Sequence, residues 1–192
     1  MKTLDEIHSF WLNPNDQNLP ETYVSGERSK LLLEIFKELD VSTRSSILEL
    51  GCNVGRNLNI LYDNGYKNLK GIEINYNAKT IMETFFPSIY NEAYIYWGSI
   101  ESADIPESDV IFTMAVLEHI HPDSEWIFDV VSKRSNKYII TIEDERVTSD
   151  RHFVRNYKSV FEPLGFKQVY ERNCIGVFEL GADFFARAFV KL

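Results

Sequence analysis

Residues 47–58 read ILELGCNVGRNL, and this stretch decides the fold. A short apolar run ends at Gly51, and a second glycine, Gly55, stands just before a segment with helical periodicity. Glycine lets the backbone turn tightly and approach a ligand without a side chain in the way. The stretch therefore predicts a strand, a glycine turn and the start of a helix, a unit that binds ligands in open parallel sheets.

The spacing of these glycines excludes two well-known phosphate-binding loops. A dinucleotide fingerprint needs glycines at relative positions one, three and six, where this chain has Gly51, Asn53 and Arg56. The GxxxxGK loop of nucleotide hydrolases is absent as well. What remains is an acidic residue, Glu49, followed by glycine, asparagine and glycine at alternate positions. Asparagine tolerates left-handed backbone angles better than most residues, so we expect the tight turn to survive at Asn53.

Strand and helix patterns alternate outward from this stretch. We expect strands at residues 46–52, 69–74, 94–97, 109–116, 137–142, 166–170 and 184–190. We expect helices at residues 29–39, 57–64, 78–86 and 122–133, and over part of 153–164. Such alternation builds an α/β fold, a doubly wound, mostly parallel seven-stranded sheet with helices on both faces. No helix separates the last two strands, so the final strand should be antiparallel.

Composition narrows the class of protein. The 192 residues suggest about one domain. Twenty basic and 29 acidic residues give a net charge of −9, which disfavours nucleic acid as a partner. The two cysteines, Cys52 and Cys174, are expected to be buried, reduced thiols. The chain start does not resemble a signal peptide, and no apolar run could span a membrane, so we expect a cytoplasmic protein without a membrane partner.

The pattern from Glu49 to Gly55 resembles motif I of the class I S-adenosylmethionine-dependent methyltransferases. Their usual form is acidic–x–Gly–x–Gly–x–Gly, and Asn53 replaces the middle glycine here. The resemblance covers about residues 23–192 and implies a Rossmann-like methyltransferase fold with S-adenosylmethionine as cofactor. Within the motif it implies contacts to the cofactor from Glu49, Gly51, Cys52, Asn53 and Gly55. An ordinary strand-to-helix turn is the alternative.

The resemblance implies further cofactor contacts after the next strands. Glu73, at the end of the second strand, would accept hydrogen bonds from the ribose hydroxyls, with Ile74 beside it. Ser99 stands where the family often has an aspartate that meets the adenine amine, and Ile100 would cover the ring. Met114 begins the segment MAVLEHIHP, where the family brings cofactor and substrate together. The alternatives are a solvated strand-end charge at Glu73 and a plain turn at Ser99.

The same segment supplies the candidate catalytic residues, His119 and Glu118. The ordinary pKa of histidine suits proton removal near neutral pH, so His119 is the candidate general base. It could instead only pack beside the cofactor. Glu118 would position the acceptor or belong to a structural network. His119 and His121 point to opposite sides of an extended segment, so the sequence predicts no metal site.

Residues 142–157 read IEDERVTSDRHFVRNY, and within them the stretch from Arg146 to Arg155 is cationic in an otherwise acidic chain. Arginine's planar fork suits carboxylate and phosphate groups. Arg151, His152 and Arg155 are therefore candidates to bind an anionic acceptor. The alternative is that these residues form salt bridges with the neighbouring acids. For Arg146 we expect this alternative.

The front of the chain is predicted to be a separate functional segment. We expect residues 1–28 to form a lid that helps to choose the substrate, and residues 29–192 to form the S-adenosylmethionine-binding domain. In the resembled methyltransferases an arginine or tyrosine before motif I can reach the carboxylate of the cofactor, and the resemblance implies that Tyr23 and Arg28 are the candidates for this role. The alternative is that the aromatic side chains only pack a helix against the sheet and that Arg28 is solvated.

The sequence thus predicts a methyltransferase that acts on a small molecule or on a sugar or glycan precursor. This acceptor is expected to be anionic if Arg151, His152 and Arg155 bind it. A non-catalytic S-adenosylmethionine-binding module and a methyltransferase for protein or nucleic acid are the alternatives. Residues 114–117 lack the Asn/Asp-Pro-Pro-aromatic segment of nucleic-acid amino methylases. The sequence predicts neither the methylated atom nor the oligomeric state.

Overall fold

The computed structural model describes residues 1–192, and backbone contacts divide the chain into two compact units. One unit is His8–Ala103. The other combines Met1–Ile7 with Asp104–Leu192. The predicted division between a lid of residues 1–28 and a domain of residues 29–192 stays a prediction.

The unit His8–Ala103 contains three parallel strands. They are β1 (Ile47–Leu50), β2 (Leu69–Glu73) and β3 (Tyr94–Trp97), and their order is β3-β2-β1. All four residues of β1 are buried, as expected of a strand that is covered on both faces. Gly71 of β2 lies opposite Glu49, and a Cβ atom there would stand 2.6 Å from the sulfur of Cys52. Only glycine therefore lets the loop after β1 cross β2 this closely.

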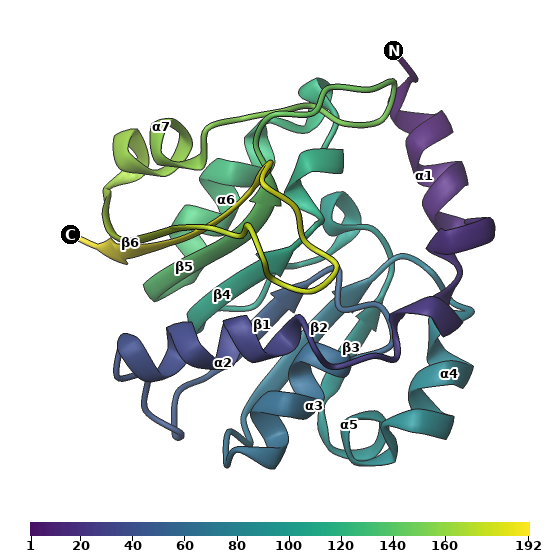
Figure 1. The fold of residues 1–192 in the computed structure, drawn as a ribbon, viewed down its shortest axis with the longest axis horizontal. Helices are drawn as coiled ribbons and strands as arrows, with labels where there is room; N and C mark the ends of the chain where they lie inside the picture. Colours follow the sequence, from purple (N-terminus) through teal and green to yellow (C-terminus); the bar gives the residue numbers. More distant parts are fainter. The chain divides into compact units, whose positions relative to one another are not determined.

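Four helices accompany these strands, three of them at the residues that the sequence predicts. They are α2 (Ser29–Glu38), α3 (Arg56–Asp63), α4 (Ala78–Phe85) and α5 (Pro87–Glu92), with short 3₁₀ turns η1 (Asp16–Asn18), η2 (Pro20–Tyr23) and η3 (Ile100–Ser102). Leu31, Leu32, Ile35 and Phe36 form the buried stripe of α2 that the sequence predicts. Helix α2 packs beside α3, and α4 beside α5 (Figure 1).

The second unit contains the other four strands. They are β4 (Ser108–Met114), β5 (Ser135–Asp144), β6 (Phe166–Asn173) and β7 (Phe184–Lys191), in the order β4-β5-β7-β6. β4 and β5 are parallel, whereas β7 pairs antiparallel with both β5 and β6. All seven strands are assigned to one mostly parallel sheet, which confirms the predicted fold class, including its antiparallel final strand.

An aromatic cluster forms much of the core of this second unit. Helices α6 (Trp126–Arg134) and α7 (Tyr157–Phe161) pack together, and α7 also contacts β6 and β7 (Figure 1). The ring of Phe161 lies 6.1 Å from that of Phe128 and 5.4 Å from that of Phe189. Edge-to-face and tilted contacts of this kind add to the hydrophobic stabilisation from burial. The remaining short turns are η4 (Leu117–His119), η5 (Pro122–Ser124) and η6 (Glu162–Leu164).

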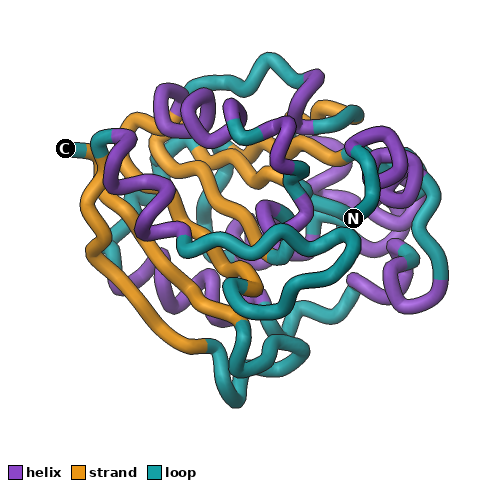
Figure 2. Tube along the Cα trace, turned by 90° about the horizontal axis from the view of Figure 1, so that it is seen from above, coloured by secondary structure: helices purple, strands orange, loops and turns teal.

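The alternation of helix and strand is plain along the backbone (Figure 2), but several helix bounds differ from the prediction. Residues 122–133 begin as a 3₁₀ turn because His121 Nδ1 accepts a hydrogen bond from the Asp123 N–H, and α6 begins only at Trp126. Asn156 caps α7, so residues 153–156 are not helical. Two helices were not predicted at all, α1 (Leu4–Leu12) and α5.

Two further expectations concern the thiols and the membrane. Cys52 and Cys174 are free and buried, as predicted. None of the helices combines the length and the apolar character that crossing a membrane requires.

Candidate functional site

The loop after β1 has an unusual backbone. Gly51, Asn53 and Gly55 all adopt left-handed angles, with φ of 70°, 45° and 81°. The predicted tight turn therefore does survive the asparagine. Gly55 leads into α3, and a Cβ atom on it would lie 3.0 Å from Ile89 and 3.1 Å from Met82. The motif thus combines a tight left-handed turn with close packing of the helix that follows.

Glu73 ties this loop to the end of β2. Its Oε2 accepts a hydrogen bond from the Asn53 N–H and its Oε1 one from the Asn75 N–H, both at 2.7 Å. The side chain is buried, and burial raises the pKa of this carboxyl while the backbone hydrogen bonds oppose the rise. Each carboxylate oxygen has a second lone pair, so Glu73 can still accept hydrogen bonds from a ligand.

Glu49 lies on β1 in a buried polar network that sequence reasoning missed. Asn57 Nδ2 donates to Glu49 Oε1 at 2.6 Å, and Ser29 Oγ donates to Asn57 Oδ1 at 2.6 Å. The other oxygen, Glu49 Oε2, is buried and has no hydrogen-bond partner. Burial raises the pKa of Glu49 to about 8, against an opposing effect of the Asn57 hydrogen bond. Ser29 and Asn57 carry no sequence signal beyond their helical positions.

Tyr23 and Arg28, predicted from the front of the chain, do lie together. The Arg28 guanidinium stands 5.3 Å from the centre of the Tyr23 ring, and the Arg56 guanidinium stands 5.7 Å from it. Both arginines are almost fully buried and both lower the pKa of Glu49. The guanidinium groups of Arg28 and Arg56 and the carboxyl of Glu49 are thus buried close to one another. Arg56 was not predicted from the sequence as a site residue.

Ser99 and Ile100 follow β3 in a short turn. The Ser99 hydroxyl accepts a hydrogen bond from the Ser102 N–H at 3.2 Å and so caps η3. Gly98 N–H donates to the Glu73 carbonyl at 2.7 Å, which anchors this turn to the end of β2. Ile100 is buried and Ile74 is partly exposed. Ser99 thus has a definite structural role, and its contact with adenine stays a prediction.

In the other unit, the loops after β4 and β5 are joined by reciprocal hydrogen bonds. Glu143 Oε2 accepts from the Val116 N–H at 2.9 Å and from the Glu118 N–H at 3.3 Å. In return, Glu118 Oε2 accepts from the Asp144 N–H at 2.5 Å. Burial raises the pKa of Glu143 to about 7. Met114 is buried at the end of β4, directly before this junction.

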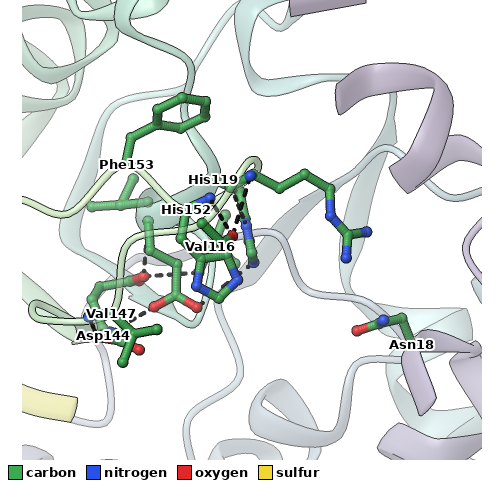
Figure 3. Close-up of polar contacts among 12 residues, drawn as sticks. Asn18, Val116, His119, Asp144, Val147, His152 and Phe153 are labelled. Atoms are coloured by element: carbon green, nitrogen blue, oxygen red, sulfur yellow. Dashed lines mark hydrogen bonds and ion pairs between the residues drawn. The ribbon is translucent and has the colours of Figure 1, made fainter. Parts of the chain in front are cut away.

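His119 lies within this junction, in contact with His152. Their rings are 4.7 Å apart and nearly perpendicular, and Figure 3 shows them next to each other. His119 Nδ1 is 3.0 Å from the Arg151 carbonyl, and its Nε2 is 3.6 Å from Glu118 Oε1. Burial lowers the pKa of His119 to about 3. The ring is therefore neutral near pH 7, but so weak a base takes up a proton poorly, and this favours a role as a hydrogen-bonding or ligating group.

The cationic segment divides into two parts. Arg155 donates to the carbonyls of Leu117, Ile120 and Phe153 and to the carboxylate of Glu125. These contacts use all five of its N–H donors, so Arg155 holds the chain together and has none left for an acceptor. Arg151 and His152 are partly exposed, and Arg151 lies 4.0 Å from Asp150.

A family model described as a methyltransferase domain matches residues 21–157. No curated protein matches the sequence at a significant level.

Solved structures resemble this fold over nearly the whole chain. Magnesium protoporphyrin IX methyltransferase from Synechocystis PCC 6803, with bound S-adenosylhomocysteine, gives a TM-score of 0.77 at 9% identity and covers 99% of this chain and 100% of its own. A TehB-like S-adenosylmethionine-dependent methyltransferase from Corynebacterium glutamicum gives 0.65 at 16% identity, covering 98% and 95%. An S-adenosylmethionine-dependent methyltransferase from Mesorhizobium loti gives 0.65 at 9% identity, covering 87% and 98%. At these identities the likeness shows the fold.

Proposed function

The chain belongs to the methyltransferase domain family, and from that premise we propose that it transfers the methyl group of S-adenosylmethionine to a small molecule or to a sugar or glycan precursor. One observation carries the cofactor part of this proposal. The loop after β1 places three left-handed residues in five positions and is held in that shape by the buried carboxylate of Glu73. Fixed, glycine-rich turns at the carboxyl ends of parallel strands are binding sites for nucleoside-containing ligands.

The polar atoms of this loop fit such a cofactor. Glu49 Oε2 and Asn53 Oδ1 are buried and have no hydrogen-bond partner within the protein. A buried acceptor that is left without a partner destabilises the fold by about 1–3 kcal/mol, so native proteins rarely keep one unless a ligand or water satisfies it. S-Adenosylmethionine brings two ribose hydroxyls and an ammonium group, which are hydrogen-bond donors, and the positive charge of the ammonium would favour the ionised, accepting form of Glu49.

Each predicted residue then has a distinct task. Glu73 would accept a hydrogen bond from the ribose hydroxyls with the acceptor capacity that its backbone partners leave on the carboxylate. Arg28, stacked on Tyr23, would bind the carboxylate of the cofactor, since a guanidinium matches a carboxylate in charge and shape. Ser99 and Ile100 would meet the adenine ring. When bound, the cofactor supplies an electrophilic methyl group, and the protein has to orient the acceptor and exclude water.

For the acceptor, the supporting residues lie after β4 and β5. Arg151 and His152 are partly exposed on the same loop, and Glu118 and His119 lie beside them. This grouping of cation, imidazole and carboxylate supports an acceptor that carries both an anionic group and a hydroxyl. Arg155 is left out of this role because all its donors are used within the chain.

Titration calorimetry with S-adenosylmethionine and S-adenosylhomocysteine tests the cofactor assignment. The wild-type protein should bind both, and Glu73→Ala should weaken binding at least about tenfold because charge-assisted hydrogen bonds contribute about 1.5–3 kcal/mol each. Glu83→Gln, which removes an exposed acid on α4, should bind like the wild type. Absence of binding by the folded wild-type protein would overturn the proposal, as would equal affinities of the wild type and Glu73→Ala.

A further inference from the structure

A carboxylate and two imidazoles meet in the unit that contains β4 and β5. One potential ligand atom from each of Glu118, His119 and His152 lies within 4.8 Å of the others. His119 follows Glu118 directly in the chain, whereas His152 comes 33 residues later. Sequence spacing therefore gave no sign of this group. The fold assembles it by tying the loop that contains His152 against η4 through the hydrogen bond from the Phe153 N–H to the Glu118 carbonyl, at 2.7 Å.

The hydrogen bond of His119 fixes its tautomer. A backbone carbonyl can only accept, so the Nδ1 atom that lies 3.0 Å from the Arg151 carbonyl must carry the proton. A neutral ring then has its lone pair on Nε2. Histidines that bind metals are oriented in the same manner, with the second nitrogen donating to a carbonyl or carboxylate.

The Nε2 lone pair of His119 points toward another acceptor. Glu118 Oε2 accepts a hydrogen bond from the Asp144 N–H, and Glu118 Oε1 lies 3.6 Å from His119 Nε2. Two electron-rich atoms at this distance repel each other unless a proton or a cation lies between them. Ligand atoms bound 2.0–2.2 Å from a metal ion stand about 3.0–3.5 Å apart, which is close to the observed separation.

His152 offers a third ligand atom from the opposite loop. Its Nδ1 is buried and has no hydrogen-bond partner within the protein. The backbone around it is ordered by the Ser149 hydroxyl, which accepts hydrogen bonds from the N–H groups of Arg151 and His152 at 3.2 and 3.1 Å. An imidazole nitrogen that is removed from water and left unpaired is costly, and coordination of a cation would satisfy it.

We propose that Glu118, His119 and His152 bind one divalent transition-metal ion. Two imidazoles and one carboxylate suit zinc, manganese or iron(II) better than calcium or magnesium, which prefer oxygen ligands. The neighbouring acidic residues Glu143 and Asp144 favour a cation here, and two cations of the same segment, Arg151 and Arg155, oppose it. The sequence-based expectation of no metal considered only His119 and His121.

Three protein ligands leave coordination positions open. A metal ion here would take an oxygen of the acceptor and lower the pKa of a coordinated hydroxyl, which makes that hydroxyl a better nucleophile toward a methyl group. This step rests on the proposed function and would replace His119 as a general base. The deprotonated oxygen would attack the methyl carbon, the carbon–sulfur bond would break with its electrons moving to sulfur, and the proton would leave to solvent. Binding of the metal itself does not depend on methyl transfer.

The test uses the full chain, stripped with a chelator and then titrated with Co²⁺ as a spectroscopic probe and with Zn²⁺ in a calorimeter. One equivalent should bind, with visible Co²⁺ absorption of a site that contains nitrogen ligands. His152→Ala should lower the affinity at least tenfold, because loss even of a residue that supports a ligand costs 10–100-fold. His121→Ala is the matched control, since this histidine caps η5 and lies outside the cluster.

The outcomes separate this proposal from the assignment of the cofactor. Absence of stoichiometric metal binding by the folded wild-type protein would overturn it, as would equal affinities of the wild type and His152→Ala. Circular dichroism of each variant establishes that the protein is folded, and Glu118→Gln gives a second variant that keeps the shape of the side chain. S-Adenosylmethionine binding, measured on the same metal-free samples, should be retained. Its loss from the wild type would count against the proposed function and not against the metal site.

Discussion

Replacing Glu49 by glutamine should change how the stability of the protein depends on pH. Glu49 is about 1% exposed on β1, and burial raises the pKa of its carboxyl from 4.5 to about 8. Between these two pH values the folded protein holds a proton on Glu49 that the unfolded chain has released. Raising the pH through this window therefore favours unfolding, and the contribution of the proton is lost completely above about pH 8.

The size of the effect follows from the two pKa values. Each pH unit between them corresponds to about 1.4 kcal/mol, so the free energy of unfolding should fall by up to about 5 kcal/mol from pH 4.5 to pH 8 on account of this group alone. Glutamine keeps the shape and the hydrogen bond from Asn57 but cannot ionise. The NH₂ group of the glutamine would replace Oε2, which has no hydrogen-bond partner, and would itself be buried without an acceptor. This should lower the free energy of unfolding by about 1–3 kcal/mol, independently of pH.

Urea unfolding of both proteins at intervals from pH 5 to pH 8.5 measures this difference. Glu49→Gln should be less stable than the wild type at pH 5 and more stable at pH 8.5. Burial also raises the pKa of Glu143, to about 7, and this slope is common to both proteins and cancels in the comparison. Parallel curves for the two proteins would refute the argument, because they would show that Glu49 titrates alike in the folded and unfolded chains.

Three further predictions concern single residues. Arg155→Ala should lower the free energy of unfolding by about 2–4 kcal/mol, and Arg155→Lys by nearly as much, because lysine cannot replace five N–H donors. Urea unfolding measures this loss, and a value below about 0.5 kcal/mol would contradict the prediction. Gly55→Ala should destabilise the protein by about 1–2 kcal/mol more than Gly165→Ala, since both glycines have positive φ but only Gly55 has a neighbour, Ile89, at 3.0 Å from an added Cβ; equal thermal shifts would refute the packing argument. Arg151→Ala should raise the acceptor KM while the calorimetric affinity for S-adenosylmethionine stays the same, and unchanged kinetics would remove Arg151 from the acceptor site.

The strands and the motif turn could be predicted because local sequence determines them. The apolar run that ends at Gly51 leads into a turn, and Asn53 adopts the left-handed angle that its residue type favours. The buried stripe of α2 follows from periodicity alone. The turn and the buried stripe depend on residues that are close together in the chain, so they can be predicted from the sequence alone.

The polar networks could not be predicted, because they join residues that are distant in sequence. Nothing near Glu118 indicates that its carboxylate would accept from the Asp144 N–H, or that Glu143 would accept from the N–H of Val116. Arg155 looked available for a ligand because sequence gives its charge and not the three carbonyls around it. Burial likewise decides that His119 has a pKa of about 3, far from the ordinary value on which its role as a base was argued.

The reciprocal hydrogen bonds between the loops after β4 and β5 also bear on how this protein could be re-engineered. At one end, Glu143 accepts a hydrogen bond from the Glu118 N–H and the Asp144 N–H donates to the Glu118 carboxylate. At the other end, the Phe153 N–H donates to the Glu118 carbonyl and Arg155 donates to the Ile120 carbonyl. Between them, residues 146–150 are exposed. The segment therefore has the form of an exchangeable cassette with two anchored ends. Variants with different residues at positions 146–150 should retain the fold. A segment containing Glu143 that is grafted into another protein without Glu118 would lose the hydrogen bonds that Glu118 makes with Glu143 and Asp144.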